Sequence, residues 1–252
     1  MPFSNQIKIM KAFSIKTDNI SKKMGLNTAL DGISMVFKEG LLNGIIGSGG
    51  AGKTTLIRTL MGLLKPDSGC ISYMENSKIV SFDKVRPRMA YMPGAQSLYP
   101  DLSVLEHLDF FRKLYGLSDG DYSLKKKELL KITRLEKFQE RKAGHLSGGM
   151  YKKLGLMCSL LSSPSILLLD EPTNGVDPIS RREFWALLYK LAAQNILIII
   201  ATAYMDEAER CSSVYLMDKG KLIISGEPRE ILDRKKVKSF EEIFLTGNME
   251  KV

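Results

Sequence analysis

A glycine-rich segment near residue 50 constrains the fold of this chain more than any other feature of its sequence. Residues 47–54 have the sequence GSGGAGKT, which fits the pattern GxxxxGK[ST]. The apolar run 44–46 precedes the segment, and residues 53–64 follow it with leucines at helical spacing. A glycine-rich turn between a strand and a helix lets successive backbone N–H groups converge on phosphate oxygens at the positive end of the helix. The segment therefore predicts a phosphate-binding loop in an α/β domain rather than a merely flexible turn.

The chemistry of the loop residues gives several of them a predicted role. Lys53 places a full positive charge against the outer phosphates of a nucleotide, and the Thr54 hydroxyl is a ligand for Mg²⁺. The residues predicted to bind the nucleotide through this loop are Gly47, Ser48, Gly49, Gly50, Ala51, Gly52, Lys53, Thr54 and Thr55.

Two adjacent carboxylates follow residues 165–169, a serine and four apolar residues. The run predicts a buried strand, and Asp170 and Glu171 stand at its carboxyl end, where open α/β sheets bind their ligands. Asp170 is predicted to hold the metal directly or through a water, and Glu171 to act as the general base beside the attacking water. Together with Lys53, they predict in-line attack of water on the γ-phosphorus of a nucleotide. Taken alone, the pair also fits an ordinary strand end with acidic residues.

Composition excludes several other classes of protein. The chain has 252 residues, of which 44% are hydrophobic and 26% charged, which is typical of a globular protein and not of a disordered, collagen-like or disulfide-bonded one. Its net charge of +9 favours anionic partners, or simply a basic surface. The three cysteines form no CxxC pair, which fits a reducing compartment. The longest apolar run, 196–201, has six residues, and the N-terminal segment lacks the apolar region of a signal peptide, so we expect any membrane association to be peripheral.

The periodicity of apolar residues predicts alternating strands and helices. Strands, largely antiparallel, are expected within 7–46, and helices through 101–162, a block that interrupts the α/β pattern as an insertion. The alternation elsewhere favours a mainly parallel sheet with crossover helices. The other predicted elements are a helix at 53–64, strands near 70–74 and 88–92, a strand at 165–170, a helix at 179–193, a strand at 195–202, a short helix at 205–210, a strand pair at 213–218 and 221–226, and helical structure over the last twenty residues.

Further segments, in order along nearly the whole chain, carry a family resemblance. Residues 146–150, LSGGM, resemble the LSGG(Q) signature of ATP-binding-cassette (ABC) ATPases, and Ser147 stands 94 residues after Lys53. Residues 170–178, DEPTNGVDP, resemble the Walker B motif and D-loop of that family, with the GKT loop as Walker A. The regions that resemble the Q-loop, the switch and the C-terminal helix of the family are 91–104, 203–209 and 239–244. Segments 177–185 and 203–211 are most similar to ATPase subunits of bacterial multidrug-type exporters, whose permease is a separate chain.

The resemblance implies an α/β fold with a P-loop NTPase core, a mainly parallel sheet, an N-terminal antiparallel β subdomain and an inserted α-helical subdomain. Residues 1–252 would form a single ABC ATPase domain. In it, 1–100 and 163–252 would form the RecA-like core with the β subdomain, and 101–162 the helical subdomain that carries the signature.

The resemblance also implies a dimer that closes head to tail around ATP and Mg²⁺. The second ABC ATPase subunit would be an identical or a different chain. The groups offered to the partner's nucleotide would be Ser147, Gly148, Gly149 and Asp177. An integral membrane permease would be the other partner, which places the chain peripherally on the cytoplasmic face of the cell membrane, and no nucleic acid partner is expected. The side chains of Tyr99, Leu102, Leu105, Phe110 and Phe111 either line a groove for a coupling helix of that permease or belong to the core of the helical block.

Three positions depart from the family pattern, all in the half-site for the chain's own nucleotide. Gly94 stands in place of the Q-loop glutamine, and Gln96, two residues further on, is the candidate third metal ligand. Ala203 stands in place of the switch histidine, and its methyl group cannot form a hydrogen bond with the γ-phosphate or the water. Met24 stands in place of the aromatic residue that stacks on adenine, and its thioether is expected to cover the purine less strongly.

The function that these features favour is an ATP-binding and ATP-hydrolysing subunit of an ABC exporter that drives a separate permease. Two alternatives remain open at this stage. One is a catalytically weak regulatory subunit that completes the site of a partner cassette, which the residues at 94 and 203 favour. The other is an ABC ATPase that is not part of a transporter. The sequence does not identify the transported substrate.

Overall fold

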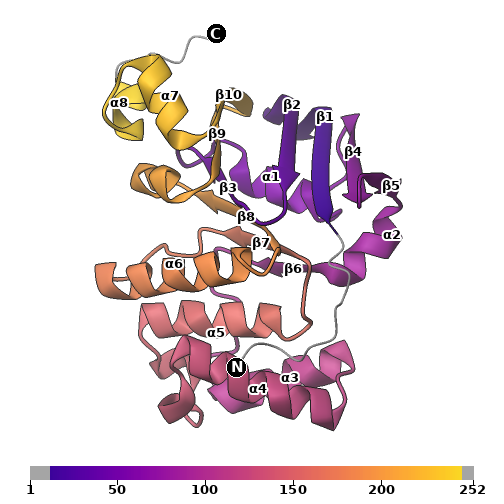
Figure 1. Ribbon diagram of the computed structural model, residues 1–252, viewed down its shortest axis with the longest axis vertical. Helices are drawn as coiled ribbons and strands as arrows, with labels where there is room; N and C mark the ends of the chain where they lie inside the picture. Colours follow the sequence, from indigo (N-terminus) through magenta and orange to yellow (C-terminus); the bar gives the residue numbers. More distant parts are fainter. Residues whose placement is uncertain (1–11, 246–252) are drawn as a thin grey trace.

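Two β-sheets of different construction form the framework of the chain, for which the computed structural model describes residues 12–245 (Figure 1). The larger sheet has six strands in the order β10-β9-β3-β8-β7-β6. Neighbouring strands in it are parallel except β9 and β10. Its strands are β3 (Leu42–Ile46), β6 (Met89–Met92), β7 (Ile166–Asp170), β8 (Leu197–Thr202), β9 (Ser213–Asp218) and β10 (Lys221–Gly226).

The central strands β3, β7 and β8 are buried along their whole length. Successive side chains of a strand point to opposite faces, and in β7 Leu167 and Leu169 join one core cluster while Ile166 and Leu168 join the other. The first cluster includes the long helices that follow β6, and the second includes the smaller sheet. Continuous apolar runs in these strands are therefore explained by packing on both faces.

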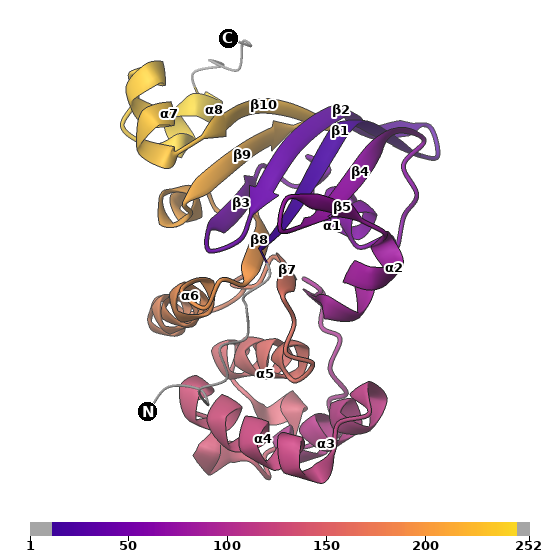
Figure 2. The ribbon, with the colours of Figure 1, turned by 45° about the vertical axis from the view of Figure 1, so that its right-hand side comes forward.

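The smaller sheet is antiparallel, with the strand order β2-β1-β4-β5. In β2 the buried side chains of Ile33, Met35 and Phe37 alternate with more exposed ones, which is the pattern of a sheet with one packed face. Figure 2 shows this sheet at the opposite end of the molecule from the block of long helices. Its strands are β1 (Phe13–Met24), β2 (Asn27–Lys38), β4 (Ser68–Glu75) and β5 (Lys78–Val80).

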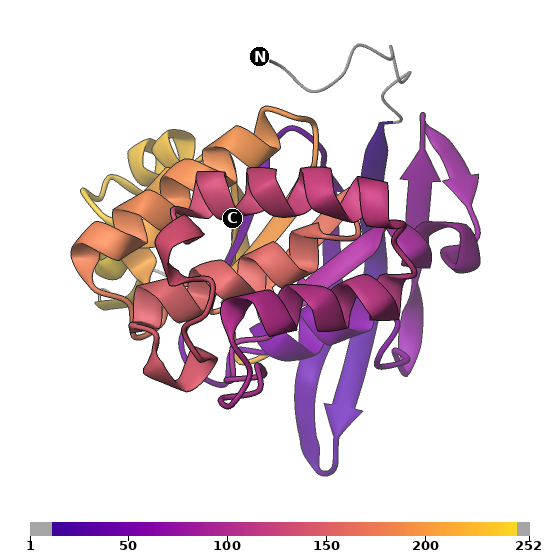
Figure 3. The same cartoon turned by 90° about the horizontal axis from the view of Figure 1, so that it is seen from below.

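Three helices between β6 and β7 lie together in the helical block, which Figure 3 shows from below. Each begins at a serine that accepts a hydrogen bond from a backbone N–H of the first turn: Ser103, Ser118 and Ser147. The helices are α3 (Val104–Tyr115), α4 (Asp119–Thr133) and α5 (Gly148–Leu160), with the 3-10 turns η2 (Glu136–Phe138) and η3 (Ala143–His145) between α4 and α5. The remaining helices are α1 (Lys53–Leu60), α2 (Phe82–Val85), η1 (Arg86–Arg88), α6 (Pro178–Ala192), η4 (Met205–Arg210), α7 (Pro228–Lys235) and α8 (Phe240–Leu245).

The structure confirms the predicted fold class and corrects several details. The run 42–46 was expected among antiparallel strands, but β3 pairs in parallel with β8 and β9. The helix expected at 53–64 ends at Leu60, because Gly62 has a φ of +68° and lies against the ring of Phe82. The short elements β5, α2 and η1 were not predicted. Parts of the first predicted strand and of the C-terminal helical segment, 7–11 and 246–252, lie outside the described residues.

Within residues 12–245, no helix is both long enough and apolar enough to span a lipid bilayer.

Candidate phosphate-binding site

The predicted phosphate-binding loop lies between β3 and α1, at the carboxyl end of the central strands. Two of its glycines are required by close packing. A Cβ on Gly47 would lie 2.3 Å from the backbone oxygen of Met217, and a Cβ on Gly52 would lie 2.3 Å from that of Ala29, on β2. Gly52 also has a φ of +101°, which L-amino acids rarely adopt. The turn is thus fixed between the end of β9 on one side and the antiparallel sheet on the other.

Lys53, the first residue of α1, has a buried side chain that contacts the backbone at the start of the loop. Its Nζ donates hydrogen bonds to the backbone oxygens of Gly47, at 2.8 Å, and Ser48, at 3.0 Å. The same nitrogen lies 3.4 Å from Oε1 of Glu171. The loop therefore holds the ammonium group at its centre, beside the carboxylate that was predicted to be the general base.

Thr54 and Asp170, the residues predicted to bind the metal, lie next to each other. The Thr54 hydroxyl donates a hydrogen bond of 3.1 Å to Oδ1 of Asp170, which is buried at the end of β7. Carboxylate and hydroxyl oxygens are hard donors that suit Mg²⁺, so this pair fits the metal that the loop sequence implies.

Tyr91, on the neighbouring strand β6, is a member of this site that sequence reasoning missed. Its hydroxyl donates to Oδ2 of Asp170 at 3.4 Å. Burial and then the charge of Asp170 raise the pKa of Tyr91 above its ordinary value, so the phenol stays protonated near neutral pH. The parallel pairing of Tyr91 with Leu168 could be inferred only from the strand order, which the sequence does not specify.

Glu171 has a left-handed backbone conformation, with a φ of +46°, and is held by contacts of both its backbone and its side chain. Its backbone N–H donates to Ala201 O at 2.8 Å, and its side-chain Oε2 accepts the N–H of Ala203 at 3.3 Å. Its Oε1 faces Lys53, and its backbone oxygen accepts a hydrogen bond of 3.1 Å from Lys152, on α5. The carboxylate is thereby directed to the loop, at the end of β7 where an attacking water was predicted.

The signature residues lie at the beginning of α5, next to the segment that follows Glu171. Ser147 is exposed and caps the helix by accepting the N–H of Met150. A Cβ on Gly148 would lie 2.8 Å from the backbone oxygen of Gly175, and one on Gly149 would lie 2.4 Å from Cβ of Ser180. Both glycines are therefore required by packing within this chain, whatever they contact in a partner.

Asp177 begins α6 and is exposed. Its carboxylate accepts the backbone N–H groups of Ile179, at 3.1 Å, and Ser180, at 2.9 Å. These hydrogen bonds, that of Ser180 first, lower the pKa of Asp177. The structure thus gives Asp177 a capping role in addition to the contact with a partner subunit that the family resemblance implies.

The three positions that depart from the family pattern are placed differently from one another. Gly94 packs directly on the end of β7, since a Cβ there would lie 3.1 Å from the backbone oxygen of Asp170. Ala203 reaches Glu171 only through its backbone. Met24 is half-exposed at the tip of the β1–β2 hairpin. Gln96 is exposed, and none of the hydrogen bonds of the described residues joins it to Thr54 or Asp170, so its metal-binding role stays a prediction.

An exposed patch of large apolar side chains lies on α3 and the loop before it, and we call it the α3 patch. Phe110 is 40% exposed, so its interpretation as a core residue is wrong, whereas Phe111 is partly buried against the core. The rings form a chain of contacts, with centroids 5.6 Å apart for Tyr99 and Phe110 and 5.4 Å apart for Phe110 and Phe111. The exposed members of the patch are Tyr99, Phe110, Leu114 and Tyr115, and the partly buried ring of Phe111 contacts those of Phe110 and Tyr115.

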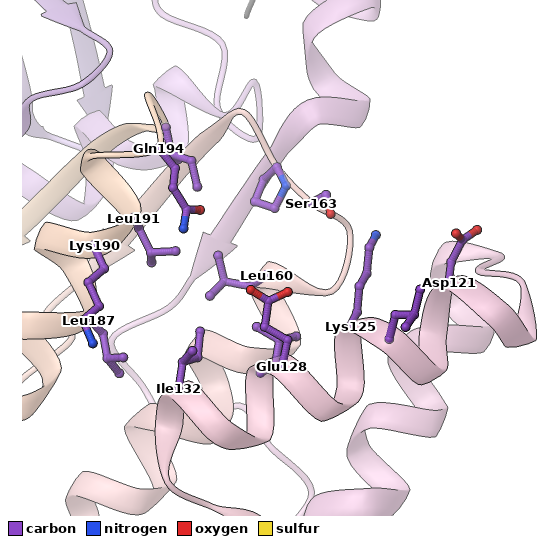
Figure 4. Close-up of a pocket in the computed structure, with 14 residues that line it drawn as sticks. Asp121, Lys125, Glu128, Ile132, Leu160, Ser163, Leu187, Lys190, Leu191 and Gln194 are labelled. Carbon is purple, nitrogen blue, oxygen red and sulfur yellow. The ribbon is translucent and has the colours of Figure 1, made fainter. Parts of the chain in front are cut away.

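A separate apolar hollow of about 660 Å³ lies between α4, α6 and the end of α5 (Figure 4). Its walls include Ile132, Leu160 and Leu191, with Lys125 and Glu128 at its rim. Pro164 and Ile196, which precede β7 and β8, place it at the amino end of the parallel strands. Open α/β sheets bind their ligands at the other end, so the hollow is not part of the phosphate-binding site.

Comparisons with known proteins identify the family of the chain. A family model described as "ABC transporter" matches residues 30–174. The chain is 44% identical to the probable multidrug ABC transporter ATP-binding protein YbhF of Escherichia coli K12 over 80% of its own length, and it spans about a third (35%) of that relative. It is 34% identical to the Nod factor export ATP-binding protein I of Ralstonia nicotianae, over 86% of this chain and 68% of that protein. A solved structure of the ATP binding subunit of an ABC transporter superposes with a TM-score of 0.79 at 28% identity, and it covers 92% of this chain and 98% of the other.

Proposed function

Because this chain belongs to the ABC transporter family as an ATP-binding subunit with ATPase chemistry, we propose that it hydrolyses ATP to drive export through a separate membrane permease. The observation that carries the proposal is the convergence of four side chains at the carboxyl ends of β3 and β7. Lys53 and Glu171 face each other at 3.4 Å, and Thr54 and Asp170 are joined at 3.1 Å. This is a site with a cation for phosphates, hard oxygen ligands and a carboxylate for water.

Each residue has a distinct task in the proposed reaction. Lys53 and the N–H groups of the loop bind the β- and γ-phosphates, and the positive end of α1 adds to their attraction. Thr54 and Asp170 would hold Mg²⁺, which when bound neutralises charge on the phosphates. Glu171 accepts the proton of the attacking water. Its left-handed backbone and its contact with Ala203 N direct the carboxylate to the loop before the substrate arrives.

A head-to-tail dimer is the assembly that we propose for the active form. Ser147 and Asp177 are both exposed, and Ser147 lies at the positive end of α5, where an anionic phosphate of a second subunit would be stabilised. In the dimer, Ser147, Gly148 and Gly149 would contribute to the partner's site. We also propose that residues 101–162 form a helical subdomain and that the rest of the chain forms the core.

Export through a permease rests on two further observations. The relatives reported above carry names that refer to multidrug transport and to Nod factor export. The α3 patch exposes aromatic side chains on the helical block, and contiguous exposed aromatic groups mark surfaces that bind other proteins. We infer that this patch receives the permease, which would place the chain at the cytoplasmic face of the membrane.

A second candidate function is favoured by Ala203. Its side chain cannot form a hydrogen bond where the family has a histidine, so the chain would turn over its own ATP slowly and complete the site of a different cassette. Loss of one stabilising contact to the transition state costs about 10²–10³ in rate. The two candidates differ in which of the two sites of a mixed dimer hydrolyses ATP.

A phosphate-release assay with the purified full chain tests the proposed function. We expect steady ATP-dependent release of phosphate that Lys53→Ala abolishes, together with loss of nucleotide binding. If the wild-type chain binds ATP but releases phosphate only when a second cassette is added, the regulatory candidate is correct. If Lys53→Ala leaves nucleotide affinity unchanged, the proposed site is wrong.

A further inference from the structure

Lys152 is a buried lysine that joins the signature helix to the end of β7. It is the fifth residue of α5, and only 8% of the residue is exposed. Its Nζ donates one hydrogen bond to the backbone oxygen of Gly94 and another to that of Glu171, both at 3.1 Å. The ammonium group therefore bridges two loops that are 77 residues apart in the sequence.

This burial has an energetic cost that the two hydrogen bonds offset. Burial lowers the pKa of Lys152 from its ordinary value, against the opposing attraction of Glu171 and Asp170. A lysine on a helix surface usually keeps its ammonium group in water, and an ammonium group that is buried requires partners. Here the partners are the backbone carbonyls of Gly94 and Glu171. Lys152 therefore holds the backbone at these two residues in place.

One of these carbonyls belongs to the residue proposed as general base. Glu171 has a φ of +46°, and a residue other than glycine in this region persists only where its surroundings hold it. Its backbone oxygen also accepts the N–H of Asn174 at 3.3 Å, which closes a turn directly after β7. Lys152 adds a charged donor to that oxygen and so stabilises the conformation that directs the carboxylate to Lys53.

The other carbonyl belongs to the loop where this chain lacks the family's glutamine. Gly94 has no side chain to reach the site, yet its backbone lies against Asp170 and Glu171: a Cβ on it would be 3.1 Å from the backbone oxygen of Asp170 and 3.3 Å from Cβ of Glu171. Lys152 ties this loop to α5 at Gly94, and the hydroxyl of Tyr151, its neighbour on α5, accepts the N–H of Leu98 further along the same loop at 2.9 Å. The loop, the general base and α5 thus meet at one nitrogen atom.

We propose that Lys152 is a positioning residue for the hydrolysis, which holds the backbone of Glu171 and the Gly94 loop against the helix that begins at Ser147. The proposal rests on the proposed function and adds to it a physical connection between α5 and the general base. In the dimer, Ser147 serves the partner's nucleotide, so Lys152 couples that contact to the general base of its own chain.

Replacement of Lys152 by methionine, which has a similar length and no charge, tests the link in the full chain. We expect kcat for phosphate release to fall about tenfold, because small displacements of a reacting group cost this much or more. The affinity for ATP, measured by fluorescent nucleotide titration, should change less than twofold because the loop at 47–54 is intact. Lys152→Arg, which keeps the donors, should recover most of the lost rate.

Lys153 provides a matched control on the same helix. It is buried to a similar extent, at 6% exposure, but it pairs with Glu183 on α6, away from the site. Lys153→Met should lower the midpoint of thermal unfolding and leave kcat within twofold of wild type. Equal losses of kcat in Lys152→Met and Lys153→Met, or a parallel loss of ATP affinity, would mean that Lys152 is merely structural.

Amide hydrogen exchange gives a readout that does not depend on catalysis. In the nucleotide-free protein, Lys152→Met should speed exchange within 93–97 and 171–176, and Lys153→Met should not. If the wild-type chain released no phosphate, the proposed function would be wrong. The exchange rates would still show whether Lys152 holds the backbone of Glu171 and Gly94 in place. If Lys152→Met did not fold, Lys152→Gln would serve in its place. Unchanged exchange in both segments would overturn the proposal.

Discussion

At the scale of single residues, the phosphate-binding loop combines glycines that are required for the fold with glycines that are not. Gly52 has no room for a side chain beside Ala29 and has a positive φ, whereas a Cβ on Gly49 would meet nothing within 4 Å. The motif pattern treats both positions as part of one glycine-rich turn, and only the structure separates them. Stability and ligand binding are therefore expected to respond differently at the two positions.

Alanine substitutions at these two positions form a matched pair. Gly52→Ala is expected to lower the free energy of unfolding by about 2 kcal/mol or more, from backbone strain and the contact with Ala29 O. Gly49→Ala should leave it unchanged. Urea unfolding of the two variants without nucleotide checks this, and equal stability of both would contradict the geometry of the loop.

Ala203, which stands where the family has a histidine, is the residue that we expect to limit the proposed rate. Its N–H contacts Oε2 of Glu171, so a side chain at this position begins beside the general base. Ala203→His should raise kcat for phosphate release about tenfold or more, because it restores a hydrogen-bonding group near the γ-phosphate. Ala203→Leu, which adds size without a polar atom, should not. No gain with histidine would show that this chain hydrolyses ATP without such a group.

At the scale of elements, prediction from the sequence succeeded where local chemistry determines the structure. The order of most strands and helices follows from local patterns, and so does the place of Lys53 and Thr54 at the start of a helix and of Asp170 at the end of a strand. The serines that begin the helices of the helical block were not predicted. Which strands lie next to each other in a sheet does not follow from local patterns. The run 42–46 is buried on both faces, yet nothing within it indicates that β8 and β9 are its parallel neighbours.

The same limit explains why Tyr91 and Lys152 were missed as site residues. Each reaches the end of β7 from a different element, β6 or α5, and the contact depends on how those elements pack. Lys152 stands in a Lys-Lys pair, and the structure shows that one member bridges two loops while the other pairs with α6. Helical periodicity alone does not distinguish the two.

The α3 patch makes a prediction about elements rather than single atoms. Phe110→Ser should leave the ATPase rate and the thermal midpoint of the isolated chain nearly unchanged, because Phe110 is 40% exposed and its helix α3 lies in the helical block, apart from α1 (Figure 1). It should reduce recovery of the chain with membranes when the chain is co-expressed with its permease. Leu124→Ser, at a 75% exposed position of α4 outside the patch, is the control. Equal recovery of Phe110→Ser and wild type would exclude the patch as the docking surface.

At the scale of the whole molecule, the two sheets and the helical block place two kinds of surface on one chain. The carboxyl ends of β3 and β7 present a site for the chain's own nucleotide, and the beginning of α5 presents Ser147 outward. The departures from the family pattern at Met24, Gly94 and Ala203 all concern the first surface, while Ser147 and Asp177 on the second match the pattern. The account therefore depends on whether the chain's own site performs the chemistry.

Single-turnover phosphate release by the wild-type chain and by Glu171→Gln, combined with nucleotide titration of both, tests this claim most directly. We predict similar ATP affinities, because Lys53 and the loop are unchanged, and a release rate at least about 10² lower in the variant, because the proton acceptor for water is lost. Equal release rates in the two proteins would contradict the assignment of Glu171 as general base and, with it, the hydrolytic function of this site.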